Sequence, residues 1–175
     1  MTDAADLRKH VRDIPDWPTP GVMFRDITPM LSDAEAFARC IAALATLGGA
    51  AGGVDLVVGI EARGFILAAP VAHQLGAGFI PVRKHGKLPH ETFSESYSLE
   101  YGEAVVEIHT DAVQPGQKVL VVDDVLATGG TVAATADLVR RAGGDIVGVN
   151  VLIELSALNG RDRNPGLPID SLLVM

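Results

Sequence analysis

One stretch of the chain decides its fold: VLVVDDVLATGGT, residues 119–131. It opens as a valine-rich apolar run, presents the carboxylates of Asp123 and Asp124, and then places two glycines between Thr128 and Thr131. Near-continuous apolar runs are typical of parallel strands that are buried on both faces, and open α/β sheets bind ligands at the carboxyl ends of such strands. The stretch therefore predicts a parallel α/β sheet with a binding site at the turn after this strand.

The glycine-containing turn has the chemistry of a phosphate site. Glycines let backbone N–H groups approach an anion, the start of a helix carries about half a positive charge, and threonine hydroxyls donate to phosphate oxygens. The two preceding carboxylates fit a ligand whose next part carries vicinal hydroxyls, or one that binds a divalent cation. A sugar phosphate meets both conditions. The simpler alternative is a turn-initiating aspartate pair followed by a threonine helix cap, which is common after any strand.

Apolar runs and helical patterns alternate along much of the chain. This order indicates a mostly parallel central sheet that is flanked by helices. Ser32 and Glu35 have the spacing of a capping box at the start of the first helix, and Pro70 is expected to kink the second. We predict strands over residues 54–60, 79–82, 118–123 and 146–155, and helices over residues 32–47, 64–76 and 131–142.

Residues 83–109 have a different pattern of polar and apolar side chains. Residues 96–101 and 103–109 alternate polar and apolar side chains around Gly102, which predicts a half-exposed antiparallel hairpin. Residues 83–94 show no periodicity, and a loop of that length in a compact domain is usually a functional lid or a disordered segment. Near the end of the chain, residues 164–168 read as a turn before a short terminal strand.

A second turn and a basic cluster extend the anion chemistry. Arg63 follows the predicted strand over residues 54–60, and its guanidinium fork suits two phosphate oxygens. The alternative is a surface arginine that caps its own loop. Arg83, Lys84 and Lys87 add positive charge within the predicted lid. Charge runs are usually solvated faces, but this one lies between two anion-binding turns of an acidic chain.

The composition limits the function classes. The 175 residues carry 22 acidic and 14 basic side chains, a formal net charge of −8, and 48% of them are apolar. That is the size and apolar share of one domain, and the acidic balance disfavours a diffuse nucleic-acid binder. Cys40 is the single cysteine, which we interpret as a buried apolar residue. We find no secretory signal and no membrane span, and we expect a cytoplasmic protein.

Several segments together resemble a known family. Residues 123–131, DDVLATGGT, are similar to the signature of type I phosphoribosyltransferases, which bind 5-phosphoribosyl 1-pyrophosphate (PRPP). More narrowly, the chain resembles the members of this family that act on adenine, in order from about Ile14 to Arg163. The segments that carry this resemblance are PGVMFRDIT (20–28), EARGF (61–65), PVRK (81–84), GKLP (86–89), YSLEYG (97–102) and EIH (107–109).

The resemblance implies an overall organisation. We expect a single α/β domain over residues 1–175, with a small N-terminal hood at residues 1–31 and a flexible lid loop and hairpin at residues 83–102. The hood would carry part of the base site. The family forms homodimers, and its partners are the small molecules adenine and PRPP rather than nucleic acid or a membrane.

The resemblance also implies which residues bind PRPP or AMP. Asp123 and Asp124 would hold the ribose hydroxyls near Mg²⁺, which is bound mainly through substrate and water. The residues implied for the 5′-phosphate are Ala127, Thr128, Gly129, Gly130 and Thr131. Those implied for pyrophosphate are Glu61, Ala62, Arg63, Arg83, Lys84 and Lys87, some of them from the partner subunit. In the family the peptide bond of the pyrophosphate turn is cis, here expected at Glu61–Ala62.

The base site implied by the resemblance selects adenine. Members that act on 6-oxopurines carry an aspartate where this chain has Ala127, and here Glu100 would supply the carboxyl group at purine N7 as the catalytic residue. The other adenine contacts would come from the Phe24 ring on one face, Val125 on the other, and the backbone of Met23 and Arg25 at the Watson–Crick edge. Two alternatives stay open: the same reaction with guanine, hypoxanthine or xanthine, and a PRPP-sensing regulator that binds nucleic acid.

Overall fold

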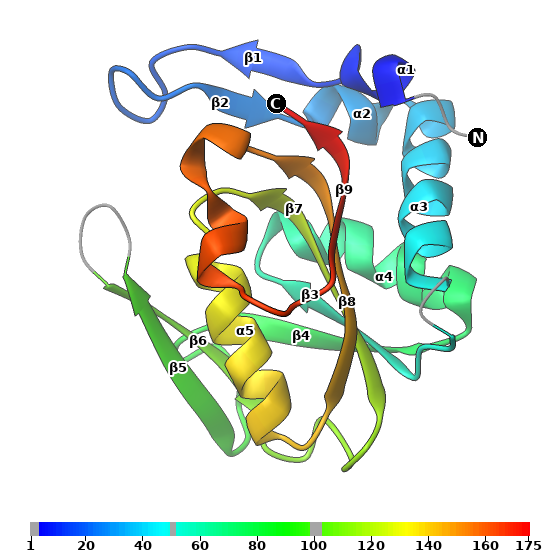
Figure 1. The fold of residues 1–175 in the computed structure, drawn as a ribbon, viewed down its shortest axis with the longest axis vertical. Helices are drawn as coiled ribbons and strands as arrows, with labels where there is room; N and C mark the ends of the chain where they lie inside the picture. The colour runs from blue at the N-terminus through cyan, green and yellow to red at the C-terminus, as the bar shows by residue number, and fades with distance from the viewer. Residues whose placement is uncertain (1–3, 50–51, 99–102) are drawn as a thin grey trace.

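The computed structural model describes residues 4–49, 52–98 and 103–175. Its centre is a seven-stranded sheet (Figure 1). The strands are β3 (Leu56–Ile60), β4 (Gly78–Lys84), β5 (Thr92–Ser98), β6 (Glu103–His109), β7 (Lys118–Leu126), β8 (Asp145–Glu154) and β9 (Ile169–Val174). Their order across the sheet is β5-β6-β4-β3-β7-β8-β9. The run from β4 to β9 is parallel, and the hairpin β5–β6 joins β4 in antiparallel pairing. The predicted mostly parallel sheet and the predicted hairpin are confirmed.

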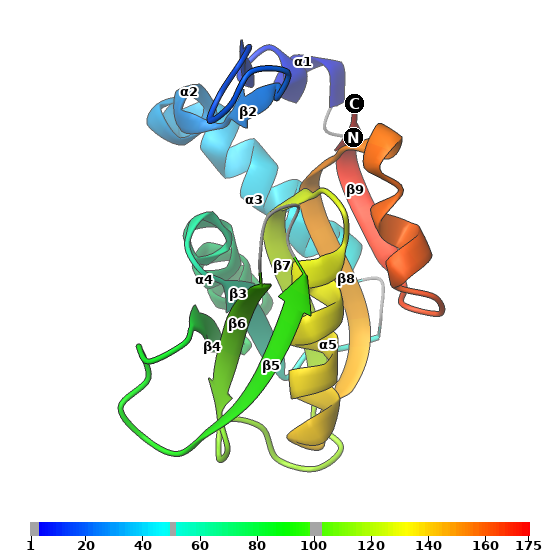
Figure 2. The same ribbon diagram turned by 90° about the vertical axis from the view of Figure 1, so that its left-hand side faces the viewer.

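Helices cover both faces of this sheet. α3 (Ala34–Gly49) and α4 (Arg63–Leu75) pack on one face, and α5 (Gly130–Arg141) packs on the other, beside the hairpin (Figure 2). Neighbouring residues of β7 alternate between the two sides, because side chains along a strand point to opposite faces. Leu120 belongs to the core under α3 and α4, and Val121 belongs to the core under α5. Burial on both faces explains why these strands read as continuous apolar runs.

The hood lies across one end of the central sheet, within residues 4–32 (Figure 1). Its two strands pair antiparallel. Its buried side chains, among them Leu7 and Met30, belong to the same core as α3 and α4. This shared core fixes the hood on the rest of the molecule. Its elements are α1 (Ala4–Arg8), β1 (Arg12–Ile14), β2 (Phe24–Asp26) and α2 (Thr28–Ser32).

The start of α3 differs from the prediction. Ser32 does not cap it, because Ser32 ends the separate helix α2 and its hydroxyl donates to the Pro29 carbonyl. Asp33 is the cap: its Oδ1 accepts hydrogen bonds from the backbone N–H groups of Glu35 (3.0 Å) and Ala36 (2.9 Å). Aspartate and serine are both good caps, and the proline in the first turn of α2 decides which of the two is used.

Two predicted boundaries also move. β4 continues to Lys84 and β5 begins at Thr92, so the predicted loop over residues 83–94 shortens to residues 85–91. β5 is the edge strand of the sheet, and its pairing with β6 holds residues 92–94 in an extended conformation. Their sequence alone shows no alternation of polar and apolar side chains. β7 passes through both aspartates to Leu126, because residues 123–126 keep their parallel pairing with β8 after the pairing with β3 has ended at Val122.

The single cysteine and the end of the chain agree with expectation. Cys40 is fully buried on α3, and burial raises the pKa of its thiol to about 12, which confirms its interpretation as an apolar residue. After β8, a tail forms two short 3₁₀ helices, η1 (Ser156–Leu158) and η2 (Gly160–Arg163), before the turn and the terminal strand β9. Within the described ranges, no helix is both long and apolar enough to cross a membrane.

Candidate functional site

The phosphate loop, residues 127–131, joins β7 to α5. Gly129 precedes the helix with φ of +80°, a left-handed conformation that favours glycine. In the described part of the chain, no side chain caps this helix start. The first N–H groups of a helix have no partner within the helix, and residues 125–132 around this helix start line a small cavity of about 50 Å³. These features suit a bound phosphate.

Asp123 and Asp124 lie buried at the end of β7, next to this loop. The backbone N–H of Asp124 donates to Oδ1 of Asp123 at 2.9 Å. Burial raises the pKa of both carboxyl groups; the charge of Asp124 raises that of Asp123 further, whereas Arg63 partly offsets the effect at Asp124. Two buried acids with one nearby guanidinium favour a ligand that brings hydroxyl donors or a divalent cation. The pair therefore fits the hydroxyls of a sugar. The described residues form no cluster of three or more His, Cys, Asp or Glu side chains, so a cation here would be held mainly by its ligand and water.

Arg63 begins α4, directly after the peptide bond Glu61–Ala62, which is cis as the resemblance implies. Its Nη2 lies 2.7 Å from Oδ2 of Asp124, and its Nη1 donates to the Arg25 carbonyl at 3.3 Å. Its guanidinium carbon stands 4.9 Å from the centre of the Phe24 ring. Arg63 therefore links the aspartate pair to the hood.

Glu61 gathers the predicted basic cluster. Its Oε1 lies 2.5 Å from Nζ of Lys87, and its Oε2 accepts the Lys84 backbone N–H at 3.0 Å and lies 3.4 Å from Nε of Arg83. Burial by itself would raise the pKa of Glu61, but Lys87, the Lys84 backbone and Arg83 together lower it to about 2. Among the predicted pyrophosphate residues, Arg83 and Lys87 thus pair with Glu61, together with the Lys84 backbone. Arg63 pairs instead with Asp124.

Glu107, on β6, is a buried acid that sequence reasoning left without a role. Its carboxylate contacts His85 Nδ1 at 2.6 Å, accepts the Gly86 N–H at 2.9 Å and accepts the Ser94 hydroxyl at 3.1 Å. Burial opposes its charge, but the bonds from Gly86, His85 and Ser94 hold its pKa below the usual range. Glu107 therefore fixes the start of the loop over residues 85–91 to the hairpin.

The predicted base site is a cavity of about 270 Å³ between the hood and the phosphate loop. It is lined by Met23, Phe24, Arg25 and Val125, the residues predicted from the resemblance, together with Arg63. Ala127 and Thr128 line it too, so the cavity opens directly onto the phosphate loop. Sequence reasoning missed the tail residues Leu155 and Leu158, which complete the wall. Glu100 lies outside the described residues.

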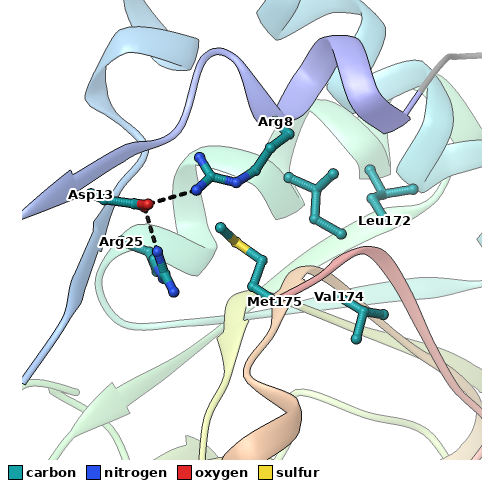
Figure 3. Close-up of a pocket in the computed structure, with 7 residues that line it drawn as sticks. Arg8, Asp13, Arg25, Leu172, Val174 and Met175 are labelled. Atoms are coloured by element: carbon teal, nitrogen blue, oxygen red, sulfur yellow. Dashed lines mark hydrogen bonds and ion pairs between the residues drawn. The ribbon is translucent and has the colours of Figure 1, made fainter.

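A larger cavity, of about 530 Å³, lies between the hood and the last strand. Figure 3 shows Asp13 held between Arg8 and Arg25, at 2.6 and 2.5 Å, with Val174 and Met175 on the opposite wall. Of the predicted site residues that the structure describes, it contains only Arg25. Both arginines are already paired with Asp13, and the phosphate loop contributes nothing to its lining. The smaller cavity, not this one, is therefore the candidate site.

Comparison with known proteins identifies the class. The phosphoribosyl transferase domain family matches residues 30–170. The chain belongs to this family of phosphoribosyltransferases, in its type I branch, as the resemblance implied.

The individual relatives narrow the class to adenine phosphoribosyltransferases. The one from Thermobifida fusca is 61% identical over 165 residues, covering 93% of this chain and 92% of that protein. The crystal structure of the one from Thermoanaerobacter pseudethanolicus superposes with a TM-score of 0.95 at 48% identity, covering 99% and 100% of the two chains. The one from Saccharomyces cerevisiae, solved with an imino-altritol bisphosphate and adenine, gives 0.93 at 37% identity over 97% and 98%.

Proposed function

We propose that the chain transfers the 5-phosphoribosyl group of PRPP to N9 of adenine, giving AMP and diphosphate. One observation carries this proposal beyond family membership: an apolar base cavity shares Ala127 and Thr128 with the phosphate loop. A base bound in this cavity and a phosphate bound on the loop would be joined by a ribose that lies beside Asp123 and Asp124. The chain is accordingly a pentosyltransferase of purine salvage.

The base cavity would hold adenine by its faces and its edge. Phe24 would cover one face of the base and Val125 the other; both line the cavity, as does Leu158. The Arg25 carbonyl already accepts a hydrogen bond from Arg63, which supports its use as an acceptor for the amino group of adenine. Ala127 brings no acid to N7, and that role falls to Glu100, as base-orienting or proton-handling residue.

Adenine N9 would attack C1′ of PRPP as diphosphate leaves, and positive charge develops on the sugar. The carboxylates of Asp123 and Asp124 hold the ribose hydroxyls and favour that charge. Backbone N–H groups of the phosphate loop and the hydroxyls of Thr128 and Thr131 hold the 5′-phosphate. Mg²⁺, held mainly through the substrate and water near Asp123 and Asp124, would supply electrostatic stabilisation of the leaving group.

The leaving diphosphate would be bound by Arg63, Arg83, Lys84 and Lys87. Glu61 and Asp124 pair with three of these cations in the ligand-free structure, at 2.5 to 3.4 Å. On binding, these cations would exchange a carboxylate partner for the diphosphate. The diphosphate would therefore meet cations that are already assembled. Closure of the loop over residues 85–91 would exclude water, which otherwise hydrolyses the activated sugar. We infer a cytoplasmic homodimer, in which the partner subunit supplies some of these cations.

An assay of separate bases tests the proposal. The purified protein is given PRPP, Mg²⁺ and one base at a time from adenine, guanine, hypoxanthine and xanthine, and the nucleotide formed is measured. We expect AMP as the main product and loss of turnover when Mg²⁺ is chelated. Preference for a 6-oxopurine would contradict the base assignment, and absence of turnover with every base would favour the regulator alternative.

A further inference from the structure

The tail between β8 and β9 packs directly against the phosphate loop. A side chain at Gly160 would overlap the Ala127 carbonyl oxygen and the Leu126 side chain. A side chain at Gly129 would overlap the Gly160 carbonyl and the Asn164 amide. Both positions therefore require glycine for steric reasons. The tail and the loop are in backbone contact, although they lie far apart in the sequence.

Asn164 makes the polar contact between the two segments. Its side chain is buried, and its Nδ2 donates to the Gly129 carbonyl at 3.1 Å and to the Gly160 carbonyl at 2.8 Å. The two N–H groups of one amide thus bridge one carbonyl of the loop and one of the tail. The Gly129 carbonyl also accepts the Ala133 N–H at 3.0 Å, the first hydrogen bond of α5.

The hydrogen bonds to the Gly129 carbonyl also fix the direction of the next backbone N–H group, which can donate to a phosphate. In a trans peptide, the C=O of one residue and the N–H of the next point in opposite directions within one rigid plane. The Gly129 carbonyl is directed to Asn164 and α5, so the Gly130 N–H of the same peptide points away from them. Gly130 is one of the residues that line the cavity of the phosphate loop.

The tail that carries Asn164 is itself anchored to the sheet. Arg161 binds Glu154 of β8 through two hydrogen bonds of 2.7 Å and donates to the Ile169 carbonyl at 2.8 Å. The bonds from Arg161 hold the pKa of Glu154 below its usual range, so this ion pair stays charged. The tail that carries Asn164 is therefore held to β8 and β9 as well as to the phosphate loop.

We propose that Asn164 is a positioning residue for the 5′-phosphate of the substrate: it orients the Gly129–Gly130 peptide so that the Gly130 N–H meets a phosphate oxygen. This inference rests on the proposed function, because it uses the assignment of the loop to the 5′-phosphate. It gives the tail a part in substrate binding that its sequence does not indicate. The base cavity is lined by other tail residues, so the effect belongs to the phosphate end of the substrate.

The test separates phosphate binding from stability. In Asn164→Ala, the KM for PRPP and the Kd for ribose 5-phosphate are expected to rise about tenfold, since each reflects one misdirected hydrogen bond to a charged group. The KM for adenine should stay within about twofold. Arg161→Met is the comparison for stability, because it removes the support of the same tail while Asn164 keeps its own amide: it should lower the melting temperature and raise the Kd for ribose 5-phosphate less than Asn164→Ala does.

Equal changes in the KM of both substrates, or unchanged ribose 5-phosphate binding in Asn164→Ala, would overturn the proposal and leave Asn164 a structural residue. If Asn164→Ala fails to fold, Asn164→Ser, which keeps one donor, is judged by the same criteria. Binding of ribose 5-phosphate by calorimetry needs no turnover. A wild-type protein that binds it but forms no AMP would therefore refute the proposed function, while the comparison of variants still decides the role of Asn164.

Discussion

Arg63 has two different sets of partners, one observed and one proposed. In the structure it pairs with Asp124, donates to the Arg25 carbonyl and stacks on Phe24. In the proposed reaction its guanidinium binds diphosphate. The observed contacts occupy the ring face and the carbonyl that we assign to adenine. Binding of PRPP would draw Arg63 toward diphosphate, and this movement would free both groups for the base.

Replacing Arg63 tests this account. In Arg63→Ala, the KM for PRPP and the Kd for diphosphate should rise about tenfold or more, because a charged hydrogen-bond donor is lost. The KM for adenine should not rise, because Arg63 competes with the base for Phe24. Arg63→Lys keeps the charge without the guanidinium fork. Its KM for PRPP and its Kd for diphosphate should therefore lie between those of the wild type and those of Arg63→Ala. An unchanged affinity for diphosphate, measured by calorimetry, would refute the assignment.

The site residues that local sequence patterns predict are those near strand ends. Asp123, Thr128 and Arg63 follow apolar runs directly, and a parallel sheet brings such turns to one edge. Asn164 and Glu107 were not found, because their roles depend on contacts with distant segments. Asn164 meets Gly129 from 35 positions away, and Glu107 meets His85 from 22. No local pattern encodes either contact.

At the scale of elements, two acids hold the segment that leaves β4. Glu61, after β3, binds Lys87 and the Lys84 backbone, and Glu107, on β6, binds His85 and Gly86. The loop over residues 85–91 therefore has a fixed beginning. The observed loop is shorter than the predicted one, because β4 and β5 extend into it through their pairing with β6. The two acids also place the basic side chains beside the pyrophosphate turn before any ligand binds.

The low pKa of Glu61 gives a prediction for stability against pH. Its folded-state pKa of about 2 lies below the ordinary value of 4.5, so its contribution is present above pH 4.5 and is lost as the pH falls toward 2. Glu61→Gln should lower the free energy of unfolding at pH 7 by about 2 kcal/mol, and the difference from wild type should shrink in acid. Urea denaturation at several pH values measures this.

Glu91→Gln is the control for that experiment, since Glu91 is an exposed acid of the same loop. It should leave the free energy of unfolding within about 0.5 kcal/mol of the wild type at every pH. A Glu61→Gln difference that stays constant from pH 7 to pH 3 would show that the ion pairs around Glu61 do not stabilise the fold through its charge.

At the scale of the whole molecule, a net charge of −8 coexists with a site for a highly anionic substrate. Acidic side chains inside the site hold the cations in place, as Glu61 and Asp124 do. The parallel sheet could be predicted, because burial on both faces leaves continuous apolar runs in the sequence. The hood was expected only from the family resemblance, since its short strands and helices have no period of their own.

A crystal structure with AMP decides where the substrate binds, because the hood borders both the proposed base cavity and the larger cavity. The proposed function places the phosphate on residues 127–131, the ribose hydroxyls at Asp123 and Asp124, and the adenine ring between Phe24 and Val125. AMP bound instead in the larger cavity, against Arg8 and Met175, would contradict it.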